Sequence, residues 1–168
     1  WSDQHINHNN IIKFSDRPFH STEEMNEYMY SEYFNIVTEK DLVIFGGDIA
    51  FGDVNETKER LKQLPGKKIL VLGNHDFDKN KCIFREYHVF DATVMAFVFQ
   101  ESIDNKICNI IVTHYPLDIS YLPENTINIH GHIHCHLAGE KRINMAVEHT
   151  EYKPKDMTER IIEEFKTY

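Results

Sequence analysis

The sequence predicts an α/β fold built as an αββα sandwich, in which two sheets pack face to face and helices lie outside them. Two short, wholly apolar runs at 42–45 and 69–72 are typical of strands buried on both faces. Helical patterns alternate with these runs in the first half of the chain, whereas the second half is rich in strand patterns. Because no linker, repeat or low-complexity stretch interrupts the chain, we interpret residues 1–168 as a single domain.

The first half of the chain carries start and stop signals for two helices. Residues 21–24, Ser-Thr-Glu-Glu, form a capping-box pattern at the start of a helix predicted over 22–39. Asp53 is predicted to cap a second helix over 54–64, which a Pro-Gly pair ends. Because the chain opens on Trp1, we also expect a few residues of a first strand to lie upstream of it.

The second half of the chain is predicted to consist mainly of strands. Runs at 93–99 and 106–113 flank an Asp-Asn pair, and this pattern predicts an antiparallel hairpin. Two further strands and a closing amphipathic helix are predicted at 126–129, 142–147 and 157–165. This order of elements favours two packed sheets with the helices outside.

Composition and charge argue against several classes of protein. Lys and Arg number 18 against 27 Asp and Glu, which gives a net charge of −9, so we do not expect binding to long nucleic acids, which requires a basic face. No apolar run approaches the roughly 20 residues that cross a bilayer, so no membrane association is expected. The three cysteines form no Cys-x-x-Cys pair, which favours a reducing, cytoplasmic location. The sequence leaves the oligomeric state open.

Residues of the kinds that bind metals follow the predicted strands at their carboxyl ends. Asp48, Asn74, His114 and the stretch His130–His134 each come after an apolar strand, where α/β sheets build their sites. The chain opens with a further motif of this kind, Asp3-Gln4-His5. Each signal is weak alone, because a single His after a strand is more often a hydrogen-bonded structural group than a ligand. Together they predict one metal site.

The mixture of ligand types indicates which metals this site would bind. Carboxylate, amide and imidazole groups together suit borderline ions such as Mn²⁺, Fe²⁺ or Zn²⁺ better than Ca²⁺ or Mg²⁺, which prefer oxygen ligands. In an extended Asp-x-His segment, the alternation of side chains places both groups on the same side. Mn²⁺ is the expected ion, with Fe, Zn or Ni as alternatives.

The same motifs, in this order, resemble those of the calcineurin-like metallophosphoesterase superfamily. The five motifs are Asp3-Gln4-His5, Gly47-Asp48, Gly73-Asn74-His75-Asp76, Thr113-His114-Tyr115-Pro116 and Gly131-His132-Ile133-His134. The stretches His8–Phe14, Arg17–Phe19 and Tyr152–Pro154 are similar to a small, single-domain subgroup found in bacteria and their phages. Asn7 stands where that subgroup usually has Gly, and Asn tolerates the left-handed backbone such a turn needs.

This resemblance implies two divalent metal ions that share one carboxylate. One ion would be bound by Asp3, His5, Asp48 and His134. The second ion would be bound by Asp48, Asn74, His114 and His132. Asp48 would bridge the two ions, since a carboxylate has two oxygens.

The resemblance also implies that the protein hydrolyses phosphoesters. Two metals about 3.5–4 Å apart bind phosphate oxygens and generate a hydroxide that attacks phosphorus. Asp48 and His75 would be catalytic, with His75 assisting the leaving group. Asp76 would either orient His75 or cap a helix or turn. We favour a phosphodiester over a phosphomonoester as the substrate; the alternative is a binding module that keeps the fold without the chemistry, although all the expected ligands are present.

Three residues are candidate contacts for the substrate. Arg17 could donate to two phosphate oxygens, or it could form a surface ion pair. His8 could contact the substrate or support a metal ligand, and Asn74 could contact the substrate besides binding metal. By strand alternation His130 points the same way as His132, which predicts a supporting role behind the ligands. The expected substrate is a small phosphorylated molecule such as a nucleotide or a cyclic nucleotide.

Overall fold

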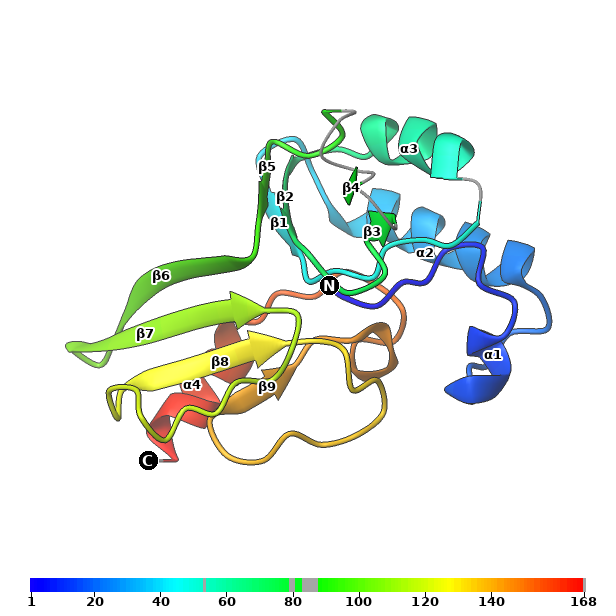
Figure 1. Ribbon diagram of the computed structural model, residues 1–168. Helices are drawn as coiled ribbons and strands as arrows, with labels where there is room; N and C mark the ends of the chain where they lie inside the picture. The colour runs from blue at the N-terminus through cyan, green and yellow to red at the C-terminus, as the bar shows by residue number, and fades with distance from the viewer. Residues whose placement is uncertain (53, 79–80, 83–87, 168) are drawn as a thin grey trace.

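The first half of the protein builds a parallel sheet covered by two helices. The structure, a computed structural model, describes residues 1–52, 54–78, 81–82 and 88–167. Three parallel strands form this sheet in the order β1-β2-β5, namely β1 (Leu42–Phe45), β2 (Lys67–Val71) and β5 (Ala92–Val94). The two long helices of this half, α2 (Thr22–Ile36) and α3 (Val54–Gln63), lie beside the sheet (Figure 1). Two-residue strands β3 (Phe77–Asp78) and β4 (Lys81–Cys82) form a small antiparallel pair.

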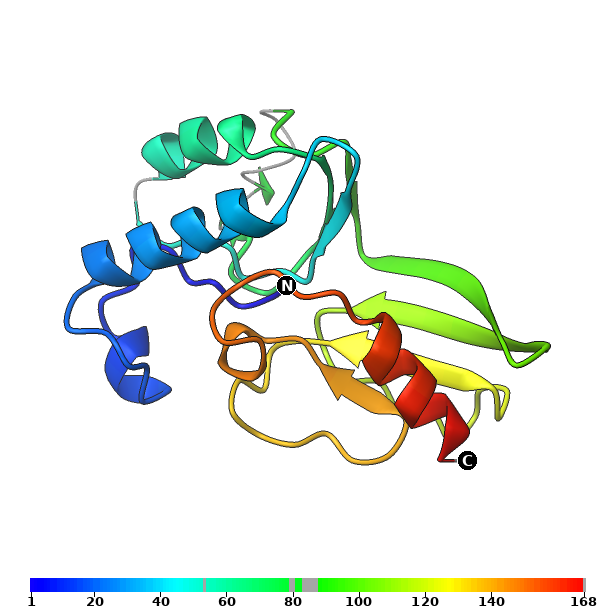
Figure 2. The ribbon, with the colours of Figure 1, turned by 180° about the vertical axis from the view of Figure 1, so that it is seen from behind.

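The second half of the protein builds a four-stranded sheet covered by the last helix. Its strands, in the order β6-β7-β8-β9, are β6 (Ala96–Ile103), β7 (Lys106–Thr113), β8 (Thr126–His130) and β9 (Arg142–Asn144). The pair β6-β7 is antiparallel, and the pairs β7-β8 and β8-β9 are parallel. Helix α4 (Thr158–Lys166) packs on this sheet, where its buried Ile161 joins an apolar cluster with strand residues (Figure 2). The predicted two-sheet α/β fold is therefore confirmed.

One predicted strand, 93–99, is wrong because the chain changes sheets in the middle of it. The run is divided at Met95: β5 pairs in parallel with β2, whereas β6 pairs antiparallel with β7. Met95 itself is largely exposed at the break. Val94 of β5 and Phe97 and Phe99 of β6 pack against the same apolar cluster, so the apolar pattern continues across the break and does not mark it.

Other element boundaries differ by a few residues for local reasons. The strand predicted at 142–147 ends at Asn144, and the 3-10 helix η2 (Val147–His149) follows. The Asn144 side chain turns the backbone here, because its Nδ2 donates to His134 O and its Oδ1 accepts from the Ala146 N–H. The capping box at the start of α2 is confirmed: Ser21 Oγ accepts from the Glu24 N–H, and the Glu24 carboxylate accepts from the His20 N–H. The predicted cap Asp53 lies outside the described residues. No helix in the described part of the chain is long and apolar enough to cross a membrane.

The first residues of the chain run between the two sheets, as both views show (Figures 1 and 2). Residues 1–6 are all buried. On one side the Asp3 N–H donates to Gly47 O at 2.9 Å, just beyond β1. On the other side the Ser2 N–H donates to Met145 O at 3.1 Å, just beyond β9. This segment therefore ties the two sheets together at the edge where their strands end.

Candidate metal centre

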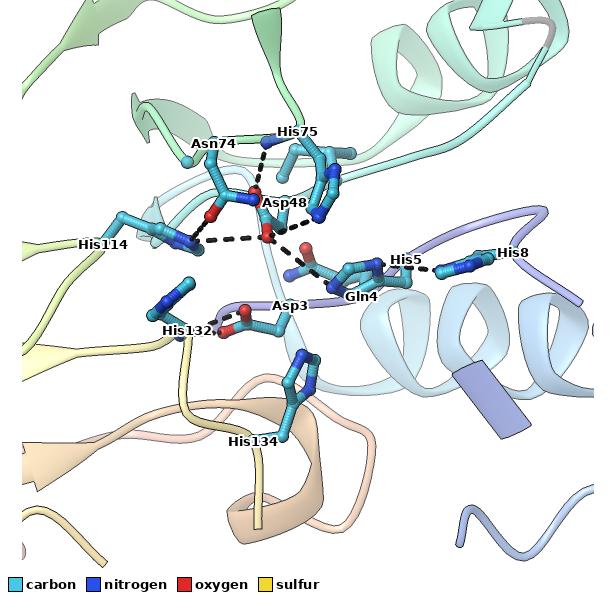
Figure 3. A network of polar contacts seen from close by, with 12 residues as sticks. Asp3, Gln4, His5, His8, Asp48, Asn74, His75, His114, His132 and His134 are labelled. Atoms are coloured by element: carbon cyan, nitrogen blue, oxygen red, sulfur yellow. Dashed lines mark hydrogen bonds and ion pairs between the residues drawn. The ribbon is translucent and has the colours of Figure 1, made fainter. Parts of the chain in front are cut away.

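The carboxyl ends of four strands meet around the first residues of the chain. Asp48 follows β1, Asn74 follows β2, His114 follows β7 and His132 lies just beyond β8. Their side chains point toward one another across the junction of the two sheets, with Asp3 between them (Figure 3). The structure therefore brings the residues that follow these four strands together, as the sequence predicted.

A first group of ligand atoms joins the start of the chain to the loop after β8. One nitrogen or oxygen atom from each of Asp3, His5 and His134 lies within 4.8 Å of the others. Asp3 and His5 are buried, whereas His134 is partly exposed. The three atoms are close enough to hold one ion.

A second group of ligand atoms is built by the strand ends of both sheets. One atom from each of Asp48, His114 and His132 also lies within 4.8 Å of the others. The amide oxygen of Asn74 lies 3.0 Å from Nε2 of His114, so the Asn74 side chain reaches the same group. All four members are those predicted for the second ion.

Asp48 lies between the two groups. Its Oδ2 atom is 3.7 Å from Nε2 of His5 and 3.4 Å from Nε2 of His114, as the dashed lines in Figure 3 show. His5 belongs to the first group and His114 to the second. A carboxylate in this position can ligate two ions at once, because each of its oxygens has two lone pairs.

The backbone is strained where it presents these ligands. Five ligand residues have φ in the left-handed region, namely Asp3 (61°), His5 (51°), Asp48 (56°), His132 (70°) and His134 (46°). Such conformations cost free energy in residues with a Cβ, and they cluster at functional sites. Asn7 also has a left-handed φ of 64°, as its place in the turn requires.

Two glycines give the ligands their space. A Cβ at Gly131 would clash with the carboxylate of Asp3, and a Cβ at Gly73 would clash with the carboxylate of Asp48. Both carboxylates belong to buried residues, and the Cβ at Gly73 would also lie 2.6 Å from the backbone N of Asp48. The glycines that precede two of the predicted ligands are therefore required by close packing against the other ligands.

Burial and charge set the protonation of the ligands. Burial lowers the pKa of His5 to about 2, which keeps its ring neutral and able to bind a metal. Burial alone would raise the pKa of Asp48, but the hydrogen bond and charge of His114 lower it below the ordinary value. Burial opposes the charged form of His114 as well, yet Asp48 and Asp3 raise its pKa to about 9. Burial raises the pKa of Asp3.

These observations fit a divalent cation. Nε2 of His5 is buried without a hydrogen-bond partner, and the Asp3 carboxylate is fully buried, which is costly for a charge that no cation balances. Nδ1 of His114 lies 2.8 Å from Gly46 O, so it carries the proton and Nε2 is left as the ligand atom. The nitrogen and oxygen donors suit borderline ions such as Mn²⁺, Fe²⁺ or Zn²⁺.

The prediction that Asp76 orients His75 does not match the structure. The Asp76 carboxylate is fully buried and accepts from the backbone N–H groups of Asp48 (2.9 Å), Ile49 (2.9 Å) and Gly73 (2.7 Å). Its alternative role as a cap is the one observed. By holding these three amides, Asp76 joins the loop after β1 to the loop after β2 and fixes the backbone of Asp48.

The prediction that Arg17 contacts a substrate is also not supported, because its side chain is fully buried. Its guanidinium donates to Asp3 O (2.7 Å) and Gln4 O (2.8 Å), and to Oε1 of Glu148 (2.8 Å). Sequence reasoning missed Glu148, which accepts from Arg17 and also lies 3.1 Å from Nδ1 of His134. Arg17 and Glu148 thus connect the Asp3 backbone to His134.

The remaining predicted residues lie around the ligands. His8 is near them, with Nδ1 at 3.2 Å from Nδ1 of His5. The His75 ring is 45% exposed, with Nε2 4.0 Å from Oδ2 of Asp48, and it belongs to neither ligand group. His130 is fully buried, and its Nδ1 lies 2.8 Å from Gly131 O rather than near a ligand side chain.

A cavity of about 580 Å³ opens beside the ligands. His5, His132 and His134 line it, together with His75. Ile11 and Phe14 of α1 (Ile11–Phe14) and further residues of the loop after β8 also line it. A small molecule in this cavity would meet both ligand groups.

Comparison with known proteins identifies the family. A family model described as calcineurin-like phosphoesterase matches residues 2–161. The chain belongs to this family. An uncharacterized protein of Methanocaldococcus jannaschii is 33% identical over 182 aligned residues, which cover 98% of this chain and 90% of that protein. A protein of unknown function from Aquifex aeolicus has a similar crystal structure, with 31% identity, a TM-score of 0.70, and coverage of 95% of this chain and 94% of that one.

Membership of the calcineurin-like phosphoesterase family confirms the family predicted from the sequence motifs. The match spans every motif from Asp3 to His134. It also agrees with the geometry, since the two Asp/His groups in this member are of a kind that binds divalent metals.

Proposed function

We propose that the protein is a phosphoester hydrolase that uses two divalent metal ions, and that its substrate is a phosphodiester rather than a phosphomonoester. The observation that carries this proposal is the sharing of Asp48 by the two ligand groups. A single carboxylate lies 3.7 Å from His5 of one group and 3.4 Å from His114 of the other. Two ions bridged in this way form the clamp on which many phosphoryl-transfer sites depend.

Each ligand group would hold one ion. Asp3, His5 and His134 would hold the first, Asn74, His114 and His132 the second, and Asp48 both. When bound, the metals supply Lewis acidity toward phosphate oxygens and a nucleophilic hydroxide near neutral pH. Mn²⁺ is the ion we propose, because the donor set mixes nitrogen with oxygen.

His75 would assist departure of the leaving group. Its backbone N–H donates to Oδ1 of Asp48 at 2.8 Å, which fixes the residue beside the bridging carboxylate. Its ring lines the cavity and belongs to neither ligand group. An imidazole that is held in place, open to a ligand and free of metal can donate a proton or a hydrogen bond to a departing oxygen.

The substrate would be a small phosphorylated molecule such as a nucleotide or cyclic nucleotide. The cavity of about 580 Å³ has the size of a small-molecule site. The net charge of −9 disfavours long nucleic acids, whereas bound divalent ions would attract a phosphate locally.

The test is hydrolysis of bis(4-nitrophenyl) phosphate by the purified protein loaded with Mn²⁺. We expect Asp48→Asn to reduce the rate by disrupting both ligand groups and His75→Ala to reduce kcat by about 100-fold or more, the usual contribution of a general acid. His20→Ala is the matched control, because His20 is exposed and lies in neither ligand group. Rates like that of the unmodified protein in both site variants would refute this mechanism.

Metal analysis distinguishes the hydrolase from a binding module that keeps the fold. Two equivalents of tightly bound metal with turnover support the enzyme. Failure to hydrolyse any phosphoester in a screen of cyclic nucleotides, dinucleotides and sugar phosphates, with both ions bound, would favour the binding module.

A further inference from the structure

Three aromatic rings line the cavity beside the ligand groups. We define the aromatic wall as His8, Phe14 and Phe51, all of which line the same cavity as His5 and His75. None of the three belongs to either ligand group. The function proposed above assigns no role to Phe14 or Phe51.

The aromatic wall is built as a continuous stack that begins at the ligands. Phe51 lies against three imidazoles, with centroid distances of 3.9 Å to His8, 4.5 Å to His75 and 5.1 Å to His5. The rings of Phe51 and His8 are nearly parallel, at 17°. This stacking holds the inner part of the wall in one position beside the residue proposed to assist the leaving group.

Phe14 forms the outer end of the wall and is open to a ligand. Its ring stands at 76° to the His8 ring, with the centroids 6.4 Å apart, so the two rings form a corner. The Phe14 side chain is 76% exposed although it lines a cavity. Ile133 and His136 of the loop after β8 line the same cavity.

We propose that the aromatic wall binds the planar base of a nucleoside phosphoester whose phosphate lies at the metal centre. This inference rests on the proposed function, and it names the class of substrate. Stacking on aromatic side chains is how proteins hold nucleobases without reading their identity, and it adds no charge to an acidic protein. A sugar phosphate would leave the Phe14 face exposed to water, whereas a base would cover it.

The first test compares two cyclic phosphodiesters that differ in the base. Adenosine 2′,3′-cyclic phosphate and glycerol 1,2-cyclic phosphate carry the same strained five-membered ring. We expect kcat/KM to be higher for the adenosine compound by between about fivefold and about a hundredfold, the range that stacking of one base supports. Phe14→Ala should bring the ratio of the two kcat/KM values close to 1, and Phe14→Trp should preserve it.

Tyr121→Ala is the matched control, since Tyr121 is 92% exposed and does not line the cavity. This variant should keep the ratio of the unmodified protein. A ratio near 1 in the unmodified protein, or an equal ratio in the unmodified protein and Phe14→Ala, would overturn the proposal.

The second test measures binding and does not depend on turnover. Calorimetry on the Mn²⁺-loaded protein compares adenosine 5′-monophosphate with ribose 5-phosphate, and the nucleotide should bind at least about fivefold more tightly. Phe14→Ala should abolish this difference. If neither cyclic phosphodiester is hydrolysed but the difference in binding is present and depends on Phe14, the aromatic wall stands and the hydrolase proposal fails. If both cyclic phosphodiesters are hydrolysed but adenosine 5′-monophosphate and ribose 5-phosphate bind equally tightly, the hydrolase proposal stands and the aromatic wall fails.

Discussion

Replacing Glu148 by Gln should weaken metal binding without removing any ligand. Oε1 of Glu148 lies 3.1 Å from Nδ1 of His134 and 2.8 Å from Nη2 of Arg17. The Nδ1–H of His134 donates to this oxygen, which leaves Nε2 free for the metal and holds the ring in place. Gln can still accept one of these hydrogen bonds, but it removes the negative charge that both donors face.

The magnitude follows from the burial of this pair. The side chains of Arg17 and Glu148 are 0% and 6% exposed, so loss of the carboxylate leaves a buried guanidinium without its counter-charge. Removing one partner of a buried ion pair costs about 3–5 kcal/mol, and we expect about 3 kcal/mol for Gln because it keeps an acceptor. Loss of a carboxylate behind a ligating His typically weakens metal binding by about 10- to 100-fold.

The assay has two parts: urea unfolding of the metal-free protein, and calorimetric titration with Mn²⁺. Glu151→Gln is the matched control, because Glu151 is 71% exposed and forms its ion pair with Lys153 at the surface. That variant should leave both quantities almost unchanged. A Glu148→Gln protein that is less stable but binds both Mn²⁺ ions with unchanged affinity would refute the positioning of His134 by Glu148.

Three further predictions concern protons, the loops and packing. The pKa of His114 is raised to about 9 in the metal-free protein by Asp48 and Asp3 against the effect of burial, so at about pH 7 an incoming ion must displace a proton. Metal affinity should therefore rise from about pH 7 to about pH 9, and calorimetry in two buffers of different ionisation enthalpy should show proton release; equal heats would contradict it. Asp76→Asn should lower the free energy of unfolding by about 2–3 kcal/mol, because the carboxylate accepts from three backbone N–H groups, and urea titration would measure it. Gly73→Ala should reduce Mn²⁺ binding, since the added Cβ would clash with the Asp48 carboxylate. Two full equivalents of Mn²⁺ in elemental analysis of this variant would contradict the prediction.

The grouping of the candidate ligands was predictable because parallel strands place their carboxyl ends at a common edge. The apolar runs of β1 and β2 are short and end at glycines, so Asp48 and Asn74 could be placed after them without knowledge of the tertiary structure. His114 and His132 follow strands of the second sheet by the same logic. The segment 1–6, by contrast, belongs to no extended strand, and its hydrogen bonds to both sheets were not predictable from its sequence.

The supporting residues could not be predicted because their partners are distant in sequence. Arg17 and Glu148 are 131 residues apart, and nothing in either local pattern indicates that the guanidinium is buried. Asp76 has the sequence position of a residue that orients His75, but its hydrogen bonds are fixed by the loop after β1. The break at Met95 is hidden because apolar residues continue across it into the other sheet.

Titration of the metal-free protein with Mn²⁺, followed by elemental analysis and electron paramagnetic resonance, tests the shared Asp48 most directly. Two ligand groups with one carboxylate between them predict two bound equivalents and a spectrum of two exchange-coupled ions. Asp48→Asn should weaken or abolish that coupling. One bound equivalent, or two ions whose spectra are independent of each other, would contradict a dinuclear centre bridged by Asp48.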